Sequence, residues 1–490
     1  MKYSNCQKTN PISCLFVAIL FAGIACTNNE SSEKYLARIG NKTISPSEFM
    51  KRAELTVRPQ NFNDKETVLN NLITEKILAL EAGENNEFVQ NLLFQGQIRG
   101  IKEQKMREKL FYQEAWNKVK LDTNEIKKAY QLSMREYRVE FYTINNEGIA
   151  KKIKDRIKAK PSAIAEIFEE LGEGRQTPEH KIKWRDPEPD VIHEALFSEP
   201  LQQGQVIGPL KLEDGSHIII RVLDWLNYPI IGGEEIHIRW QEVTEKLRQI
   251  KANKIWRNYM ANVMKGKKIE FNNESFYFLS EMYLYQYFSS QNRNALKNVA
   301  EEIPPIKIEE RLDDPFFTID NEVWTIGDFK RAIMSHPLVY RPQNINKSNF
   351  RDQFKYAIAD MIRDHYLNQR AYKKSLDEDH EVKETVEMWK DAQLALYHRN
   401  QILISAKEKK IINENRIYIN NKYWITYLDS LHMKYENHIQ INHEEFKKIN
   451  LTNINMFAMK QNVPYPIAVP GFPLFTNSVM LNYGKEKGVN

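Results

Sequence analysis

The run Tyr137-Arg-Val-Glu-Phe-Tyr-Thr-Ile144 and the later run Asp214-Gly-Ser-His-Ile-Ile-Ile-Arg-Val222 decide the fold of this 490-residue chain. Both are rich in β-branched and aromatic residues and have the length of a strand, which predicts strands over residues 137–144 and 217–223. Asp214-Gly215 has the composition of a tight turn, and Gln205-Val-Ile-Gly-Pro-Leu210 precedes it. A closing hairpin is therefore predicted here.

The residues between these strands have helical spacing. Apolar residues recur at intervals of three and four in two consecutive segments: Ile149, Ile153 and Ile157, then Ile164, Ile167, Phe168 and Leu171. Each pattern predicts a helix with one buried stripe, and Pro161-Ser162 marks the start of the second. A short helix is predicted through Ala195-Leu-Phe197. Together these elements predict one small α/β domain over residues 135–226.

This order resembles the parvulin, or PpiC-type, family of peptidyl-prolyl cis/trans isomerases. The likeness is most specific in the run ALF…GQVIGPL…DGSHIIIRV, from Ala195 to Val222. Rotation about an X–Pro bond crosses a barrier of about 18–20 kcal/mol and takes tens of seconds or more unaided. A catalyst needs an apolar pocket for the proline ring and polar groups that favour the twisted amide over the planar one.

The resemblance also implies site residues. His217 matches the second family histidine and is the expected catalytic residue, whereas Phe141 stands where the family has its first histidine. Ile192 stands at the family phenylalanine, so Phe141, Ile192 and Phe197 are expected to contact substrate. The fold is thus predicted to be kept and the active site partly eroded, which leaves the isomerase activity open. The alternative role for His217 is a strand residue hydrogen-bonded inside a small core.

Composition excludes several other classes of function. The length suggests about three domains. The 70 basic and 65 acidic residues are interspersed and leave a net charge of +5, so no nucleic-acid footprint is visible. There is no Gly-rich phosphate loop, no Cys/His metal spacing and no nucleophile elbow. We therefore expect no metal, no small-molecule cofactor and no nucleic-acid partner. His180 and His193 are interpreted as surface residues.

The N-terminus has the pattern of a bacterial lipoprotein signal. Residues 1–25 combine a basic start with an apolar stretch that is short for a membrane span, and Leu20-Phe-Ala-Gly-Ile-Ala-Cys26 resembles a lipobox. All three cysteines of the chain lie within residues 1–26, so no disulfide is expected in the mature protein. Residues 26–33 form a polar tether. The predicted location is the periplasmic side of a membrane of the cell envelope, with the outer membrane favoured.

A second pattern occurs twice. A short strand followed by a helix start is found first at Tyr35-Leu-Ala-Arg-Ile39 and Ser45-Pro-Ser-Glu48. The same pattern returns at Phe316-Phe-Thr-Ile319 and Thr325-Ile-Gly-Asp328. Two further features also occur twice. An Arg-Pro-Gln-Asn run is found at 58–61 and 341–344, and a Trp-containing helix before a short strand is found at 254–271 and 422–441. This order predicts an α+β protein in which helical arms flank the parvulin-like domain and the arm module is duplicated. The predicted segments are an arm at 34–134, the parvulin-like domain at 135–226, a closing helix and strand at 235–272, a second arm with its closing elements at 316–442, and a Pro-containing surface tail at 443–490.

The layout resembles the SurA/PrsA group of extracytoplasmic folding factors, whose helical arms hold unfolded chains. The resemblance implies unfolded or nascent extracytoplasmic proteins as partners. Three readings remain open: an active proline isomerase that also holds clients, a chaperone that has kept the parvulin fold for binding, and a structural subunit of an envelope assembly. The altered position at Phe141 favours the second.

The lipobox predicts that the mature chain is anchored through lipid on Cys26. A diacylated N-terminal cysteine supplies the two signals that make an anchor stable, so Cys26→Ser is expected to release a soluble protein. Mass spectrometry of the mature N-terminus checks this. An unmodified terminus at any other residue would contradict it.

Overall fold

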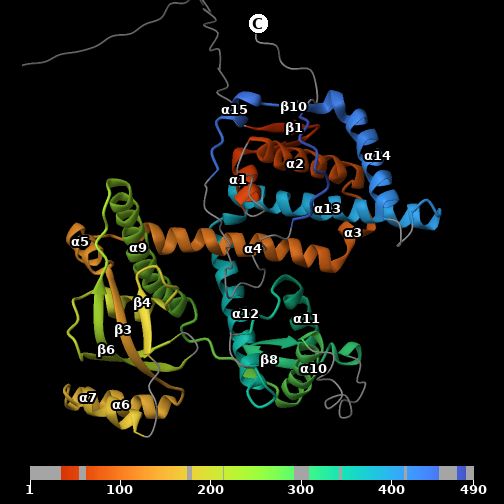
Figure 1. Cartoon of the computed structure of the whole chain (residues 1–490). Coiled ribbons are helices and arrows are strands. Elements are labelled where there is room, and N and C mark those ends of the chain that lie inside the picture. The colour runs from red at the N-terminus through yellow and green to blue at the C-terminus, as the bar shows by residue number, and fades with distance from the viewer. Residues whose placement is uncertain are drawn as a thin grey trace, which may run out of the picture.

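The computed structural model describes residues 35–54, 62–173, 179–212, 215–291, 308–340, 345–412, 417–451 and 472–481. These form an α+β protein with three small antiparallel sheets among many helices (Figure 1). The signal segment, Cys26, the tether and both Arg-Pro-Gln-Asn runs lie outside the described residues. No described helix is both long enough and apolar enough to cross a membrane.

The middle of the chain forms the sheet domain. Its elements are β3 (Arg135–Ile144), α6 (Glu147–Ala159), α7 (Ala163–Gly172), β4 (Glu179–Lys183), α8 (Asp190–Phe197), β5 (Val206–Lys211) and β6 (His217–Asn227). The strand order is β4-β3-β6-β5, and every pair is antiparallel. The strands and helices predicted from the sequence pattern are all present. One detail differs: Ile149 is 50% exposed, and Ala150 takes its place in the buried stripe of α6.

The two faces of this sheet are covered by different helices. Helices α6 and α7 pack on the face that carries Tyr142, Ile144 and Ile219. The other face packs against α8 and against two elements outside the predicted domain, α5 (Thr123–Leu132) and α9 (Gly233–Val263). We assigned α5 to the arm and α9 to a closing segment from sequence, but Ile126, Leu132 and Val243 share the core of the sheet. The sheet domain is therefore larger at both ends than its sequence pattern indicated.

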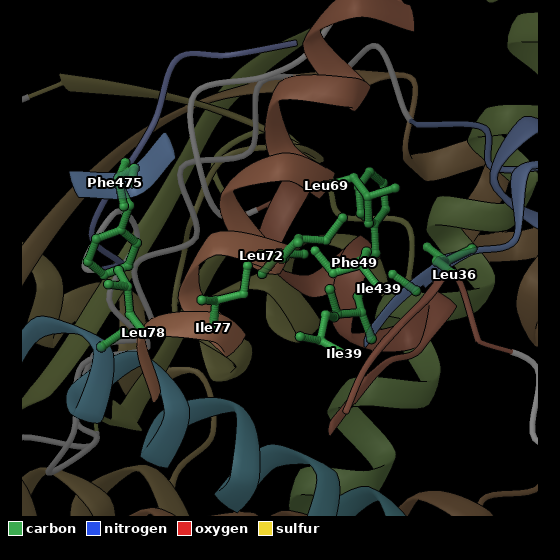
Figure 2. Close-up of a cluster of buried hydrophobic side chains, with 14 of the residues drawn as sticks. Leu36, Ile39, Phe49, Leu69, Leu72, Ile77, Leu78, Ile439 and Phe475 are labelled. Atoms are coloured by element: carbon green, nitrogen blue, oxygen red, sulfur yellow. The ribbon is translucent and has the colours of Figure 1, made fainter. Parts of the chain in front are cut away.

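The two ends of the chain together build the first helical unit. Its elements are β1 (Ala37–Ile39), β2 (Lys42–Ile44), α1 (Pro46–Glu54), α2 (Phe62–Ala82), α13 (His380–Glu408), α14 (Ile417–Tyr435), η5 (Glu436–His438), β10 (Ile439–Ile441) and α15 (His443–Lys447). The sheet order is β10-β1-β2. Helix α1 begins where predicted, with Pro46 at its first position and the Ser45 hydroxyl accepting from the Glu48 amide at 2.9 Å. Figure 2 shows its core, where Ile439 packs with Ile39 and Phe49.

The second helical unit has a similar plan. Its elements are β7 (Glu270–Phe271), α10 (Asn273–Gln291), η3 (Ile308–Arg311), β8 (Pro315–Ile319), β9 (Glu322–Thr325), α11 (Ile326–Ser335), α12 (Phe350–Lys373) and η4 (Leu376–Glu378). Thr325 and Asp328 form a complete capping box at the start of α11. Its core is rich in phenylalanine, including Phe316, Phe329 and Phe354.

The closing strands are exchanged between the two helical units. β7 ends the first half of the chain but pairs with β8, and β10 ends the second half but pairs with β1. Hairpin, helices and closing strand follow one another in the same order in both halves, and the duplication stays a hypothesis about their origin. Each unit is completed by a strand from the other half, so neither half is self-sufficient.

Helix α4 (Leu92–Glu114) links these parts. It is preceded by α3 (Glu87–Gln90), followed by η1 (Trp116–Lys118), and runs across the molecule in Figure 1. It contacts α9, α11, α12 and α13. Gly96 allows α4 to pack closely against α11, because a Cβ at this position would lie 2.7 Å from the Cβ of Met334 on α11.

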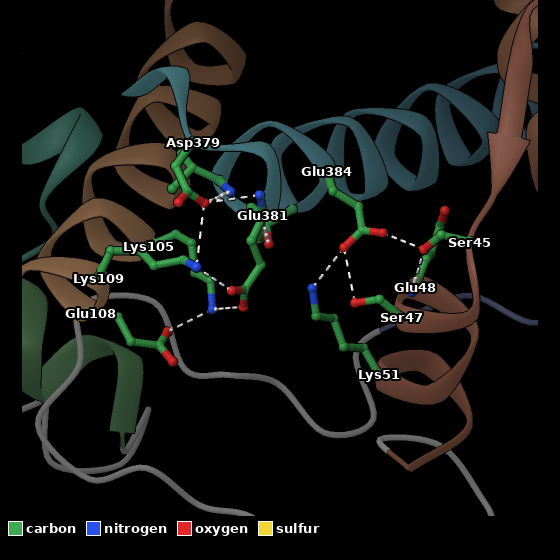
Figure 3. A network of polar contacts seen from close by, with 12 residues as sticks. Ser45, Ser47, Glu48, Lys51, Lys105, Glu108, Lys109, Asp379, Glu381 and Glu384 are labelled. Carbon is green, nitrogen blue, oxygen red and sulfur yellow. Dashed lines mark hydrogen bonds and ion pairs between the residues drawn. The ribbon is translucent and has the colours of Figure 1, made fainter. Parts of the chain in front are cut away.

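Helix α13 is held by ionic contacts near its start (Figure 3). Lys105 and Lys109 of α4 reach Glu381 at 2.6 and 2.5 Å. Glu384 accepts from Lys51 at 3.0 Å and from Ser47 at 3.0 Å, and also contacts Ser45. The start of α13 is thereby tied to both α4 and α1.

A buried group of charges lies further along α13. The Lys76 ammonium is 2.6 Å from Glu48 and 2.9 Å from Asp391, and all three residues are buried. Beside it Arg52 makes two bonds to Glu75, at 2.7 and 2.8 Å. Burial alone would lower the pKa of Lys76, but attraction to the acidic partners outweighs it and raises this pKa. The ammonium therefore stays charged and connects α1, α2 and α13.

Candidate functional site

His217 opens strand β6 and is fully buried. It pairs directly opposite Ile144 of β3, on the face covered by α6. Its Nε2 atom is 3.0 Å from the Lys154 ammonium, and its Nδ1 atom is 3.9 Å from Glu147, both on α6. Burial, and next the Lys154 charge, lower the pKa of His217. The ring is therefore neutral at pH 7, with Nε2 accepting from Lys154.

Phe141 lies on the opposite face of the same sheet. It is three residues before Ile144 on β3 and pairs with Ile220, and side chains alternate between faces along a strand. Its ring is half-buried and lies 5.1 Å from the ring of His180, which is exposed as predicted. The sheet therefore separates Phe141 from His217.

Ile192 and Phe197 come from α8 and lie on the Phe141 face. Both are buried, and the Phe197 ring is 5.4 Å from Tyr137 and 5.3 Å from Trp184. The structure thus brings together the three residues expected to contact substrate. It does not bring His217 to them, so the single site implied by the resemblance is divided between two faces.

A cavity of about 460 Å³ opens on the α8 face, between α5, α8 and α9. Trp184, His193 and Phe197 supply its aromatic wall, and Leu247 and Ile250 of α9 add an aliphatic one. Of the residues expected to contact substrate, only Phe197 lines it. The chemistry of the wall suits an apolar or aromatic side chain, or a proline ring.

The rim of the cavity is charged but balanced. Glu125 pairs with Lys251 at 2.5 Å and Glu199 with Lys128 at 2.6 Å, and Glu194 also pairs with Lys254. These pairs are largely solvated, so they add little to stability. They surround an apolar wall with groups that can also hydrogen-bond a polypeptide backbone.

His193 is not a surface residue, contrary to our interpretation of the sequence. It is 1% exposed, its Nε2 lies 3.1 Å from the Trp184 carbonyl oxygen, and its ring lies 4.4 Å from the Trp184 ring. Burial lowers the pKa of His193 to about 4. The spacing of the residues could have indicated this burial, because His193 and Phe197 are four residues apart in α8 and so lie on the same face of the helix.

Within the described part of the chain, no three His, Cys, Asp or Glu side chains are grouped so that they could hold a metal ion.

The similarity of this chain to known proteins is confined to solved structures. No family model matches the chain. No curated protein matches it either. Among solved structures, foldase protein PrsA from Streptococcus pneumoniae is similar at 15% identity, over 43% of this chain and 85% of that chain, with a TM-score of 0.17. Foldase PrsA from Lactococcus lactis is similar at 15% identity, over 47% and 93%, with a TM-score of 0.16. Values this low assign no family.

The depressed pKa of His193 predicts an acid-sensitive sheet domain. The unfolded chain takes up this proton near pH 6.5, whereas the folded domain resists it until about pH 4. The stabilisation is therefore complete above pH 6.5 and is lost as the pH falls toward 4, by about 3 kcal/mol in all. Hydrogen exchange of α8 amides between pH 4 and 7, corrected for intrinsic rates, measures this loss.

His193→Gln keeps a donor for the Trp184 carbonyl but does not titrate, so it should make the protection of the α8 amides less dependent on pH. His180→Gln, at an exposed histidine of the same domain, is the matched control and should leave it unchanged. The same acid-dependent loss in His193→Gln as in the parent protein would show that another group is responsible.

Proposed function

We propose that this protein is a membrane-anchored extracytoplasmic folding factor that binds unfolded client polypeptides. In this proposal the sheet domain is a parvulin-like module that has kept the ability to bind apolar or proline-containing segments, with isomerase activity weak or lost. The anchor would be the lipid on Cys26. Anchoring would place the protein on the periplasmic side of an envelope membrane, with the outer membrane favoured.

The observation that carries this proposal is the separation of His217 from the apolar residues Phe141, Ile192 and Phe197. An isomerase needs its polar groups beside the bound proline, and His217 instead contacts Lys154 on the other face of the sheet. Losing one positioned polar group from an active site commonly costs a factor of about 10²–10³ in rate. Binding does not require that group, because apolar burial alone can hold a client side chain.

Exposed apolar side chains at the end of β6 and after it support client binding. The end of β6 carries Leu226, and the connection from β6 to α9 carries Tyr228 and Ile231; these side chains are 56%, 51% and 87% exposed. We call these three residues the linker strip. Isolated exposed apolar residues are ordinary, but three within six positions form a surface that an unfolded chain can cover.

Two assays on the purified chain from residue 27 onward test the proposal. Protease-coupled isomerisation of a short X–Pro peptide series should show little acceleration over the uncatalysed rate. Aggregation of a chemically unfolded client should be suppressed in proportion to the amount of protein added. His217→Ala should leave this suppression unchanged.

Ile231→Ser tests the linker strip, because it removes its most exposed apolar side chain without disturbing a core. It should weaken client holding severalfold. Ile149→Ser, at an exposed isoleucine of α6 outside the linker strip, is the matched control and should have no effect. Strong isomerisation that His217→Ala abolishes would establish an active enzyme instead. Failure of the parent protein to suppress aggregation would favour the structural-subunit reading.

A further inference from the structure

Residues 472–481 occupy a groove on the first helical unit. This segment, which we call the strap, has neither helix nor strand and lies against α2, α13 and α14. The sequence predicted a surface tail here. Phe472 and Phe475 are instead buried, while Leu474 between them is 61% exposed. Figure 2 shows Phe475 reaching toward Leu78 of α2.

The strap is held by contacts to its main chain. Asn71 of α2 accepts from the Phe475 and Thr476 amides at 2.8 and 3.1 Å and donates to the Thr476 carbonyl at 2.6 Å. Trp424 of α14 donates its indole N–H to the Phe475 carbonyl at 3.0 Å. Asn70, also on α2, donates to the Ser478 carbonyl at 2.8 Å.

These bonds do not depend on which side chains the strap carries. Each uses a backbone N–H or C=O, which every polypeptide offers and which an unfolded polypeptide leaves without an intramolecular partner. Main-chain bonds of this kind supply affinity in peptide recognition, and side-chain pockets supply selectivity. The donors and acceptors are buried, since Asn70 is fully covered and Asn71 is 6% exposed.

Two aromatic pockets provide the selectivity. The Phe472 ring lies 4.5 Å from the ring of Trp389 and under the Arg52 guanidinium, 3.7 Å from its centre. The Phe475 ring enters the core of the first helical unit. The pockets accept residues three apart, with an exposed residue between them.

The groove is not filled by the strap. A cavity of about 590 Å³ remains beside it along α14. Its wall includes Ile425 and Met433, which are 56% and 70% exposed, and Met480 of the strap itself. Methionine side chains adapt to varied apolar partners, so this surface suits a ligand of variable sequence.

We propose that the groove formed by α2, α13 and α14 is a binding site for non-helical polypeptide segments with aromatic residues three apart, and that the strap is its intramolecular occupant. The identification of such segments as clients rests on the proposed function, but the site itself does not. Because the strap is tethered, its effective concentration at the groove is high, and a separate peptide must compete with it.

A labelled peptide with the sequence of residues 472–481, Phe-Pro-Leu-Phe-Thr-Asn-Ser-Val-Met-Leu, is the probe. Binding is measured by fluorescence anisotropy on the full mature chain. The double variant Phe472→Ala, Phe475→Ala weakens the strap and should bind the peptide at least tenfold more tightly than the parent. Adding Asn71→Leu to it should abolish the gain. Val479→Ala, at an exposed strap residue outside the cavity, is the matched control and should behave like the parent.

A second measurement does not require any variant to fold. Excess peptide added to the parent protein should increase exchange of the Phe475 and Thr476 amides, because the strap is displaced. Unchanged exchange at saturating peptide, or no tighter binding by a folded double variant, would overturn the proposal. A groove that binds the peptide in a protein that fails to suppress client aggregation would confirm this site and refute the proposed function alone.

Discussion

The buried ammonium of Lys76 is the interaction on which the rest of the structure depends. It lies between Glu48 and Asp391, and Asp391 is 315 positions away from it in the sequence. Moving such charges out of water costs several kcal/mol per ion, and only close, complete pairing offsets that cost. Burial raises the pKa of Glu48 because it disfavours the charged carboxylate, and the Lys76 ammonium opposes this shift. The N-terminal helices are therefore stable in this arrangement only with α13 in place.

This constraint explains how the molecule is organised. Once α13 is fixed against α2, α14 and β10 follow it, and β10 completes the sheet that β1 and β2 begin. The same helices form the walls of the strap groove. The sheet domain lies to one side of this frame, beside α9 and one end of α4 (Figure 1). Its cavity is lined by residues of α5, α8 and α9. The proposed function uses two apolar surfaces for binding polypeptide: the cavity of the sheet domain and the strap groove of the first helical unit.

Local patterns predicted the local structure, and long-range pairing determined the rest. Runs of β-branched and aromatic residues located β3 and β6, helical spacing located α6 and α7, and the capping residues located the start of α1, because each of these signals is local in the sequence. The division of the candidate site depends on the register that places Ile144 opposite His217, and a shift of one residue would reverse the face. The burial of His193 depends on its contact with Trp184, and the exchange of β7 and β10 depends on contacts between the two halves of the chain. Side-chain periodicity carries no information about either contact. The pairing of Lys76 with Asp391 likewise has no local signal.

The central claim is that the two ends of the chain form one cooperative unit that includes the strap groove. Lys76→Met removes the cation at similar volume, which leaves the buried Glu48 carboxylate without its ion pair and Asp391 with Lys42 alone, at a cost of about 3–5 kcal/mol. Hydrogen exchange of the full chain should then show protection falling together in β1, in β10 and in residues 472–481. Lys51→Met, which breaks the more exposed pair with Glu384, should leave all three nearly unchanged. Loss of protection confined to α2, with β10 and the strap unaffected, would contradict the account.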